Sequence, residues 1–196
     1  SRGGTSRSEG GGHRGPTCVR VGETSLVSLL PDQTNQAQTV DATPTLYWYI
    51  PPTPASAAEF VLTDDQGEIL YLQEIALPEQ PGVVKLTLPI EAALVVGSRY
   101  RWIFSLMCDE SAPSRNTYVS GYIERTTLSS LARTRLRTAE PLEQAQIFAQ
   151  SNIWHDALDR VAQVRKHRQD AWEGLLASVG LSAIAQEPFQ DCCTAK

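Results

Sequence analysis

The chain has 196 residues, 41% of them hydrophobic and 20% charged, which suits one globular domain with a hydrophobic core. Its net charge of −5 argues against a nucleic-acid partner. No apolar run approaches the ~18 residues that a membrane helix needs, so we expect no membrane span.

Residues 1–17 are predicted to form an extended arm rich in glycine and arginine. Positions 1–15 hold six of the thirteen glycines and three arginines, with no aliphatic side chain. Such a stretch cannot bury enough apolar surface to offset the entropy lost on ordering. Residues 1–15 carry a net charge of +2, which leaves −7 on the remainder. We therefore expect the arm to dock on an acidic body, its own or a neighbour's.

The arm residues assigned to this contact combine charge, for pairing with acidic groups, with close backbone approach. They are Arg2, Arg7, Arg14, Gly10, Gly11 and Gly12. The arm lacks the alternating apolar residues of a strong donor strand, which favours an irregular path over β-addition.

Residues 18–126 have the texture of a β-sandwich. About seven short apolar runs recur with turn signals between them, a pattern typical of antiparallel sandwiches. The clearest strand segments are 45–52, two within 58–75, 82–89, 99–108 and 117–126. Between the two strands of 58–75, Gly67 is expected to adopt a positive φ in a short hairpin loop.

The segment RYRWIFSLMC (99–108) carries a large apolar load on one face, from Tyr100 and Trp102 to Cys108. Tyr100 follows a leucine and a glycine at the start of the strand, as the corner tyrosine of an immunoglobulin-like sandwich does. Trp102 replaces the antibody cysteine, which excludes a true antibody domain. We expect the Tyr100 hydroxyl to bond to nearby backbone.

Residues 127–190 are predicted to form a helical subdomain, with a C-terminal tail at 191–196. After a short helix at 128–136, a helix beginning at Pro141 and another after Asn152 form a hairpin with tetratricopeptide-like packing positions. Asp170 to Glu173 resembles a capping box that opens a third helix, ending at Gly180. One hairpin cannot bury its apolar face alone, so it must lie on the sandwich or on another subunit.

Sequence motifs for catalysis are absent, and we expect no enzyme activity, cofactor or metal site. His155 and Asp156 are neighbours on a helix, so their side chains point about 100° apart and form no dyad with each other. With His167, His155 is interpreted as part of a solvated helix face.

Tyr47 and Tyr49 lie on the opposite face of segment 45–52 from Leu46, Trp48 and Ile50. If exposed, these tyrosines are candidates for binding a glycan or a protein. The alternative is that the C-terminal helices cover them, since those helices must pack somewhere.

Four cysteines without CxxC spacing indicate disulfides, and hence an oxidising compartment, more than zinc. A bond between Cys18 and Cys108 is predicted to pin the root of the arm to the end of the 99–108 strand. Cys192 and Cys193 have three possible states: a vicinal bridge, a cross-link to another chain, or free thiols.

Blocks along nearly the whole chain resemble a cyanobacterial family, domain of unknown function 928. They are a Gly/Arg-rich start ending at Cys18, then PTLYWYIPP, AEFVLTDDQGEILYLQ, VGSRYRWIFSLMCD, GYIERTTLSSLA, IWHDALDRVAQVR and WEGLLASVGL. The resemblance implies an exported protein whose signal peptide has been removed, and no catalytic residues to transfer.

Two functions are expected from these features. The first is a secreted or periplasmic assembly protein, whose arm docks on the next copy to build a filament or another homopolymer. The second is a monomeric binding module of the cell surface or periplasm that recognises a glycan or protein through exposed tyrosines.

Overall fold

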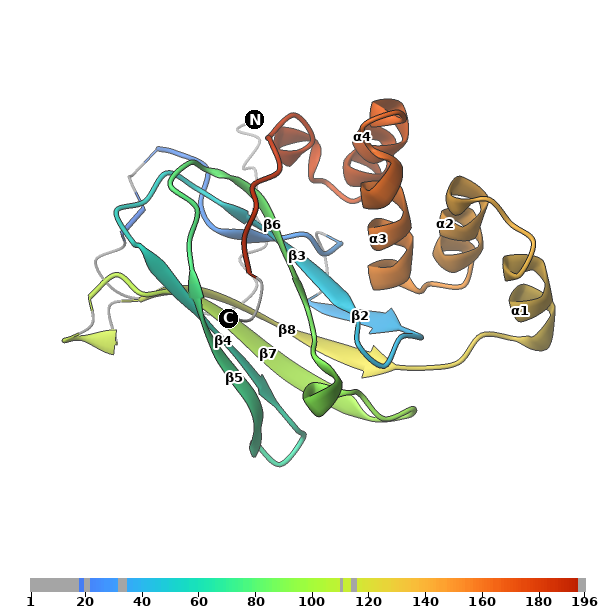
Figure 1. The fold of residues 1–196 in the computed structure, drawn as a ribbon, viewed down its shortest axis with the longest axis horizontal. Helices are drawn as coiled ribbons and strands as arrows, with labels where there is room; N and C mark the ends of the chain where they lie inside the picture. The colour runs from blue at the N-terminus through green and yellow to red at the C-terminus, as the bar shows by residue number, and fades with distance from the viewer. Residues whose placement is uncertain (1–17, 20–21, 32–34, 110, 114–115, 194–196) are drawn as a thin grey trace, which may run out of the picture.

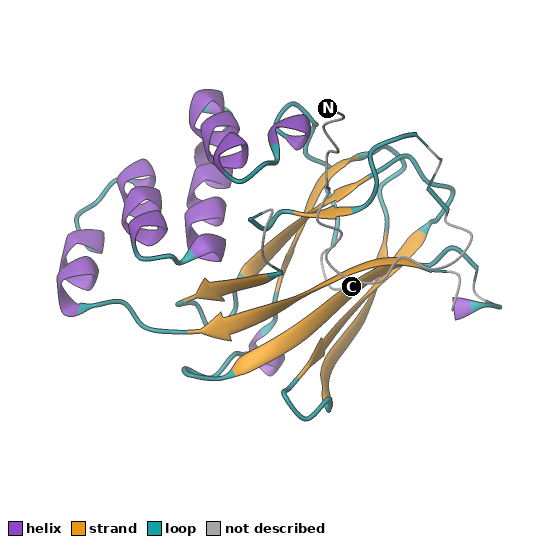
Figure 2. Cartoon of the chain, turned by 180° about the vertical axis from the view of Figure 1, so that it is seen from behind, coloured by secondary structure: helices purple, strands orange, loops and turns teal. Residues whose placement is uncertain are grey.

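The structure is a computed structural model that describes residues 18–19, 22–31, 35–109, 111–113 and 116–193 (Figure 1). Two β-sheets face each other, and the helices gather beside them on one side (Figure 2). The arm predicted for residues 1–17 lies outside the described residues.

The smaller sheet has three strands and the larger sheet five. The smaller follows the order β1-β3-β6, with β1 at Val27–Ser28, β3 at Thr45–Ile50 and β6 at Gly82–Thr87. The larger follows the order β2-β8-β7-β4-β5, with β2 at Gln36–Thr39, β8 at Thr117–Arg125, β7 at Arg99–Leu106, β4 at Ala57–Thr63 and β5 at Ile69–Ala76. A 3₁₀ turn, η1, spans Ile90–Ala92 between β6 and β7.

The core between the sheets is dominated by aromatic rings. Trp48 of β3 stacks on Phe104 of β7 with ring centroids 4.4 Å apart and meets Trp102 edge-on at 5.6 Å. All three side chains are fully buried. Aromatic pairs in these geometries add to the free energy gained by burying their area. The alternation predicted for segments 45–52 and 99–108 is thereby confirmed, and the β-sandwich with it.

One expectation about the sheets is wrong. The sandwich was predicted to be antiparallel, yet β2 pairs in parallel with β8, from Gln36 opposite Tyr122 to Thr39 opposite Arg125. Alternation and turn residues specify the faces of each strand and the direction of hairpin partners. They do not specify how strands far apart in the chain pair, so this short strand escaped prediction.

Two local predictions about turns are confirmed. Gly67 has a φ of +84° in the β4–β5 loop, a conformation that glycine adopts without a steric penalty. The hydroxyl of Tyr100 accepts a hydrogen bond of 2.9 Å from the Val95 backbone N–H, five residues upstream. This bond ties the loop before β7 to the strand.

Four helices follow β8. They are α1 (Ser130–Leu136), α2 (Pro141–Gln150), α3 (Trp154–Val164) and α4 (Gln169–Ser178), and a second 3₁₀ turn, η3, spans Ser182–Ile184. The predicted capping box at Asp170 is wrong, because α4 begins one residue earlier and has no side-chain cap. Asp170 instead pairs with the guanidinium of Arg168 at 2.9 Å.

The helices pack on the sandwich, which is one of the two locations predicted from the sequence, the other being a second subunit. Tyr47 and Tyr49 of β3 share a second hydrophobic core with Leu158 of α3, Trp172 of α4 and other apolar helix residues. The chain then returns to the smaller sheet, where the Val83 N–H donates to Pro188 O at 2.8 Å and the Gln190 N–H donates to Val83 O at 2.9 Å. This return covers the outer edge of β6.

We predict that Gly121→Ala lowers the free energy of unfolding by about 1–3 kcal/mol, the usual cost of overpacking a core. A Cβ at Gly121 would lie 2.6 Å from the Trp102 ring and 2.7 Å from Asn35 O, and neither group can move freely. Chemical denaturation monitored by tryptophan fluorescence measures the loss.

The matched control is Gly174→Ala in the exposed part of α4, where an added Cβ meets nothing within 4 Å. It is expected to raise stability by about 0.5–1 kcal/mol, because alanine favours helix. Equal effects of the two substitutions would contradict the packing described for Gly121.

Candidate functional site

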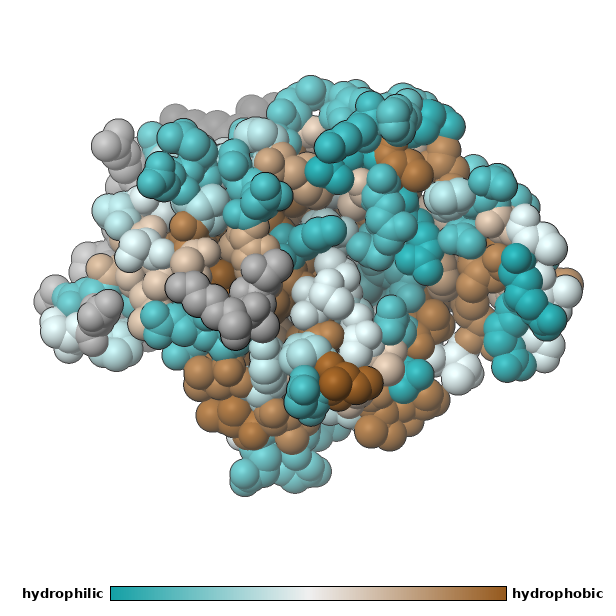
Figure 3. Space-filling model, viewed as in Figure 1, coloured by the Kyte–Doolittle hydropathy of each residue, from teal (hydrophilic) through white to brown (hydrophobic). Residues whose placement is uncertain are grey.

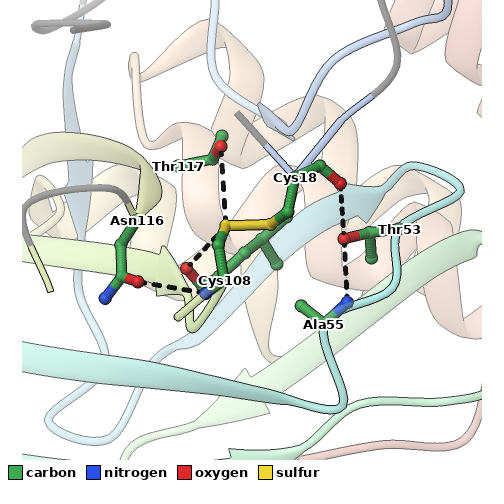
Figure 4. The surroundings of a disulfide bond; sticks show 7 residues. Cys18, Thr53, Ala55, Cys108, Asn116 and Thr117 are labelled. Carbon is green, nitrogen blue, oxygen red and sulfur yellow. Dashed lines mark hydrogen bonds between the residues drawn. A yellow bond between two sulfur atoms is a disulfide. The ribbon is translucent and has the colours of Figure 1, made fainter. Parts of the chain in front are cut away.

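The Cys18–Cys108 disulfide joins the root of the arm to the end of β7, as predicted. The two Cα atoms are 5.4 Å apart and the residues are 90 positions apart in sequence. Hydrogen bonds hold both ends: the Thr53 hydroxyl donates to Cys18 O at 2.8 Å, and the Cys108 N–H donates to Asn116 Oδ1 at 3.0 Å (Figure 4). Whatever precedes Cys18 therefore starts from a fixed point on the sandwich.

A groove of about 600 Å³ lies beside this fixed point. Pro52, Pro54 and Pro81 supply its apolar wall, and Glu79 its negative charge. Prolines have no backbone N–H, so these positions donate no main-chain hydrogen bond into the groove. A positive charge bound there would be matched by Glu79.

Cys192 and Cys193 form a vicinal disulfide, which decides among the three states left open by the sequence. Both residues are partly buried and pack against the edge of the sandwich core. The Cys192 sulfur lies 3.7 Å from Ala76 O, at the end of β5. The bridge therefore belongs to the contact between the C-terminal tail and the larger sheet.

The tyrosines proposed as exposed binding residues are buried. Tyr47 and Tyr49 are each only 4% exposed, because the helical layer covers that face of β3. The Tyr47 hydroxyl donates a 2.6 Å hydrogen bond to Asp159 Oδ1 of α3. Burial and the nearby Asp159 charge both raise the pKa of Tyr47. The aromatic surface postulated for a glycan or protein is thus an internal contact, and the alternative of helical cover is correct.

The interpretation of His155 as a solvated residue is wrong. Its side chain is 3% exposed, and neither ring nitrogen has a hydrogen-bond partner among the described residues. Burial lowers the pKa of His155 to about 4, so the ring is neutral at physiological pH. A signal was present in the sequence, since His155, Leu158 and Ala162 share one helical stripe, and both apolar members are buried.

Asp156 is buried beside the end of β2. Its Oδ2 accepts a 3.3 Å hydrogen bond from the Val40 N–H, and Thr39 also bonds its carboxylate. Burial outweighs these bonds and raises the pKa of Asp156 to about 6. His155 and Asp156 thus lack the shared hydrogen bond of a catalytic dyad. Both side chains are buried where the helices pack on the sheets.

A second open groove, of about 700 Å³, lies among α1, α2 and α3. Arg133, Arg137 and Arg160 line it, but Arg160 already donates to Gln144 Oε1 at 2.9 Å and pairs with Asp159 at 3.4 Å. Sequence reasoning missed Gln144 and Asp159, because Gln144 of α2 bonds Arg160 of α3 and Asp159 of α3 bonds Tyr47 of β3, and such contacts between elements leave no local pattern.

These features define a disulfide-bonded β-sandwich with a helical layer that contacts both sheets, through β3 of the smaller and β2 of the larger. The chain belongs to the family described as Domain of Unknown Function (DUF928), whose family model matches residues 9–189. No curated protein matches the chain. Of the helices in the described ranges, none is long and apolar enough to cross a bilayer.

We predict that replacing both Cys18 and Cys108 with serine lowers the free energy of unfolding by about 4–5 kcal/mol in the chain-entropy estimate, because a long loop is released. The matched pair Cys192→Ser and Cys193→Ser closes no loop and should cost far less. Thermal denaturation of the two double variants without reductant tests this. A larger loss at 192 and 193 would contradict the assignment of Cys18–Cys108 as the stabilising bridge.

We predict opposite pH responses from variants of His155 and Asp156. The folded-state pKa of His155 is about 4, below the ordinary 6.5, so only the unfolded chain takes up a proton between these values. Acidification through this window therefore costs up to about 3 kcal/mol of stability through His155. For Asp156 the folded-state pKa is about 6, above the ordinary 3.8, so the folded chain holds the extra proton and acidification stabilises it.

Relative to the unsubstituted protein, His155→Leu should therefore gain stability as the pH falls from 6.5 to 4, and Asp156→Asn should lose it. Urea denaturation at pH 7, 6, 5 and 4 measures both slopes. Slopes of the same sign for the two variants would refute the buried states described here.

Proposed function

We propose that this protein is a non-enzymatic structural protein of an extracytoplasmic compartment that assembles with copies of itself through its N-terminal arm. The single observation that carries the proposal is the Cys18–Cys108 bond. It anchors the root of a segment that cannot build a core of its own. A contact made by such a segment is then held at a defined place on the body.

Charge supports a neighbouring copy as the partner. The arm carries Arg2, Arg7 and Arg14, whereas the rest of the chain is acidic, so every copy has both a basic arm and an acidic body. The groove beside Cys18 provides Glu79 at a place that an extended arm can reach from outside. An arm that binds the next body head-to-tail produces a ring or an open polymer.

The disulfides support the proposed extracytoplasmic location of the protein. Two bridges in a chain of this size are typical of proteins that mature under oxidising conditions, such as secreted or periplasmic proteins. We infer that the protein is exported, in agreement with its cysteine usage.

The finer fold assignment is also part of the proposal. We infer an immunoglobulin-like sandwich, supported by the hydrogen bond of the Tyr100 corner. The α2–α3 pair is inferred to be a single tetratricopeptide-like hairpin, supported by the buried residues Ala145, Phe148, Ala157 and Val161.

We predict that deleting residues 1–16, with Cys18 retained, abolishes the polymer and leaves the melting temperature within about 2 °C, since the segment has no aliphatic side chain to bury. Light scattering coupled to size exclusion and negative-stain electron microscopy measure the assembly.

The matched control keeps the length of the arm and replaces Arg2, Arg7 and Arg14 with glutamine. If the contact is electrostatic, this variant loses assembly almost as fully as the deletion does, and salt weakens assembly of the unsubstituted chain. Polymers of undiminished size from the deletion variant would end the proposal.

A further inference from the structure

The larger sheet has one long edge that pairs with no further strand among the described residues. Among the described strands, β1 has only two residues, and the edge of β6 is covered by residues 188–190. The edge strand β2 packs against α3. On the opposite side of that sheet, β5 has eight residues and pairs only with β4.

The backbone groups on this open edge can be identified from the pairing. The Leu77 N–H donates to Ser56 O at 2.9 Å, so this pair is of the hydrogen-bonded type. In an antiparallel ladder such pairs alternate with pairs whose N–H and C=O groups point away. The outward groups of β5 therefore belong to Leu72, Glu74 and Ala76, and Cys192 lies against Ala76 O.

The side chains along this edge are aliphatic. Ile69, Leu70 and Leu72 are 60%, 46% and 51% exposed, and Ile90 of η1, which packs beside β5, is 74% exposed. Figure 3 shows these apolar side chains gathered along the lower edge of the molecule, over β5 and η1. Edge strands usually carry charges or prolines that block further pairing, and between Ile69 and Ala76 only Glu74 is charged.

We propose that β5 is an interface with a second copy of this chain, in which two β5 strands pair antiparallel across a twofold axis. A row of unsatisfied backbone groups calls for an extended strand, not for a helix or a small ligand. Every copy carries such a strand, with the same outward groups and the same aliphatic side chains. When two copies of β5 pair antiparallel, outward N–H and C=O groups of each strand bond those of the other, and the contact is the same from both sides, as a twofold interface requires.

Charge selects the register. With Leu72 opposite the second copy's Leu72, the two leucines pack on one face, and each Glu74 lies opposite Leu70 of the other strand. A parallel pair in register would place the two Glu74 carboxylates side by side, which is unfavourable. The bulge at Leu70, where the register with β4 shifts between Leu62 and Thr63, limits the paired stretch to Leu70–Glu74 of each strand, centred on Leu72.

This interface deepens the proposed function and rests on it for its biological role, because a twofold contact would join chains that the arm builds head-to-tail. The two contacts use different residues, since the arm starts from Cys18 and the β5 interface centres on Leu72. The arm lacks aliphatic side chains and does not match the apolar edge of β5.

The test uses the chain lacking residues 1–16, so that arm contacts cannot contribute. Sedimentation equilibrium from micromolar to millimolar concentration is expected to show a monomer–dimer equilibrium. Leu72→Lys should weaken the dimer at least 30-fold, because it places a charge at the axis. Leu131→Lys, at a site 71% exposed on α1 in the helical layer, should change dimerisation less than threefold.

Amide hydrogen exchange gives the decisive residue-level readout. The N–H groups of Leu72 and Glu74 should exchange fast in dilute protein and slow down in concentrated protein, whereas those of Tyr71 and Gln73, bonded to β4, stay protected in both. A monomer at every concentration, or Leu72 and Glu74 amides that exchange equally at all concentrations, overturns the β5 interface and leaves the arm proposal standing. Loss of polymer on deleting the arm, with the dimer retained, confirms both contacts.

Discussion

Strand β3 is buried on both of its faces, and the arrangement of the other elements depends on this double burial. Leu46, Trp48 and Ile50 enter the aromatic core between the sheets, while Tyr47 and Tyr49 enter a second core beneath the helices. A six-residue strand with five fully buried side chains has no solvent face. The larger sheet and the helical layer must therefore both be present for the two faces of β3 to be removed from water.

The seam between helices and sheets is polar in places as well as apolar. Tyr47 bonds Asp159, the Trp154 indole N–H donates to Leu29 O at 2.8 Å, and Asp156 receives the Val40 N–H. These bonds fix the register of α3 on β3 and β2. Asp156 accepts a backbone hydrogen bond across this contact, while neither ring nitrogen of His155 has a hydrogen-bond partner among the described residues. Burial shifts the pKa of each group in the direction that favours its uncharged form.

The helices and the C-terminal segment cover some strand edges of the two sheets and leave others exposed. Residues 188–190 cover β6, and α3 covers β2, but β5 keeps outward backbone groups under aliphatic side chains. Cys18–Cys108 holds the start of the described chain in place at the end of the sandwich where β7 finishes. The proposed contacts with neighbouring copies thus use different residues, in the groove beside Cys18 and in the stretch of β5 around Leu72.

The sequence by itself determined the faces of the main strands, the glycine turn at Gly67, the start of α2 and the pairing of Cys18 with Cys108, because the first three follow from local spacing and the last from the small number of cysteines. Only the tertiary structure decided that Tyr47 and Tyr49 lie under helices, that His155 is buried, and that β2 runs parallel to β8. Those facts depend on which elements meet across long stretches of chain. Local periodicity shows that a residue occupies a given face of its own strand or helix, but a second element decides whether that face is covered.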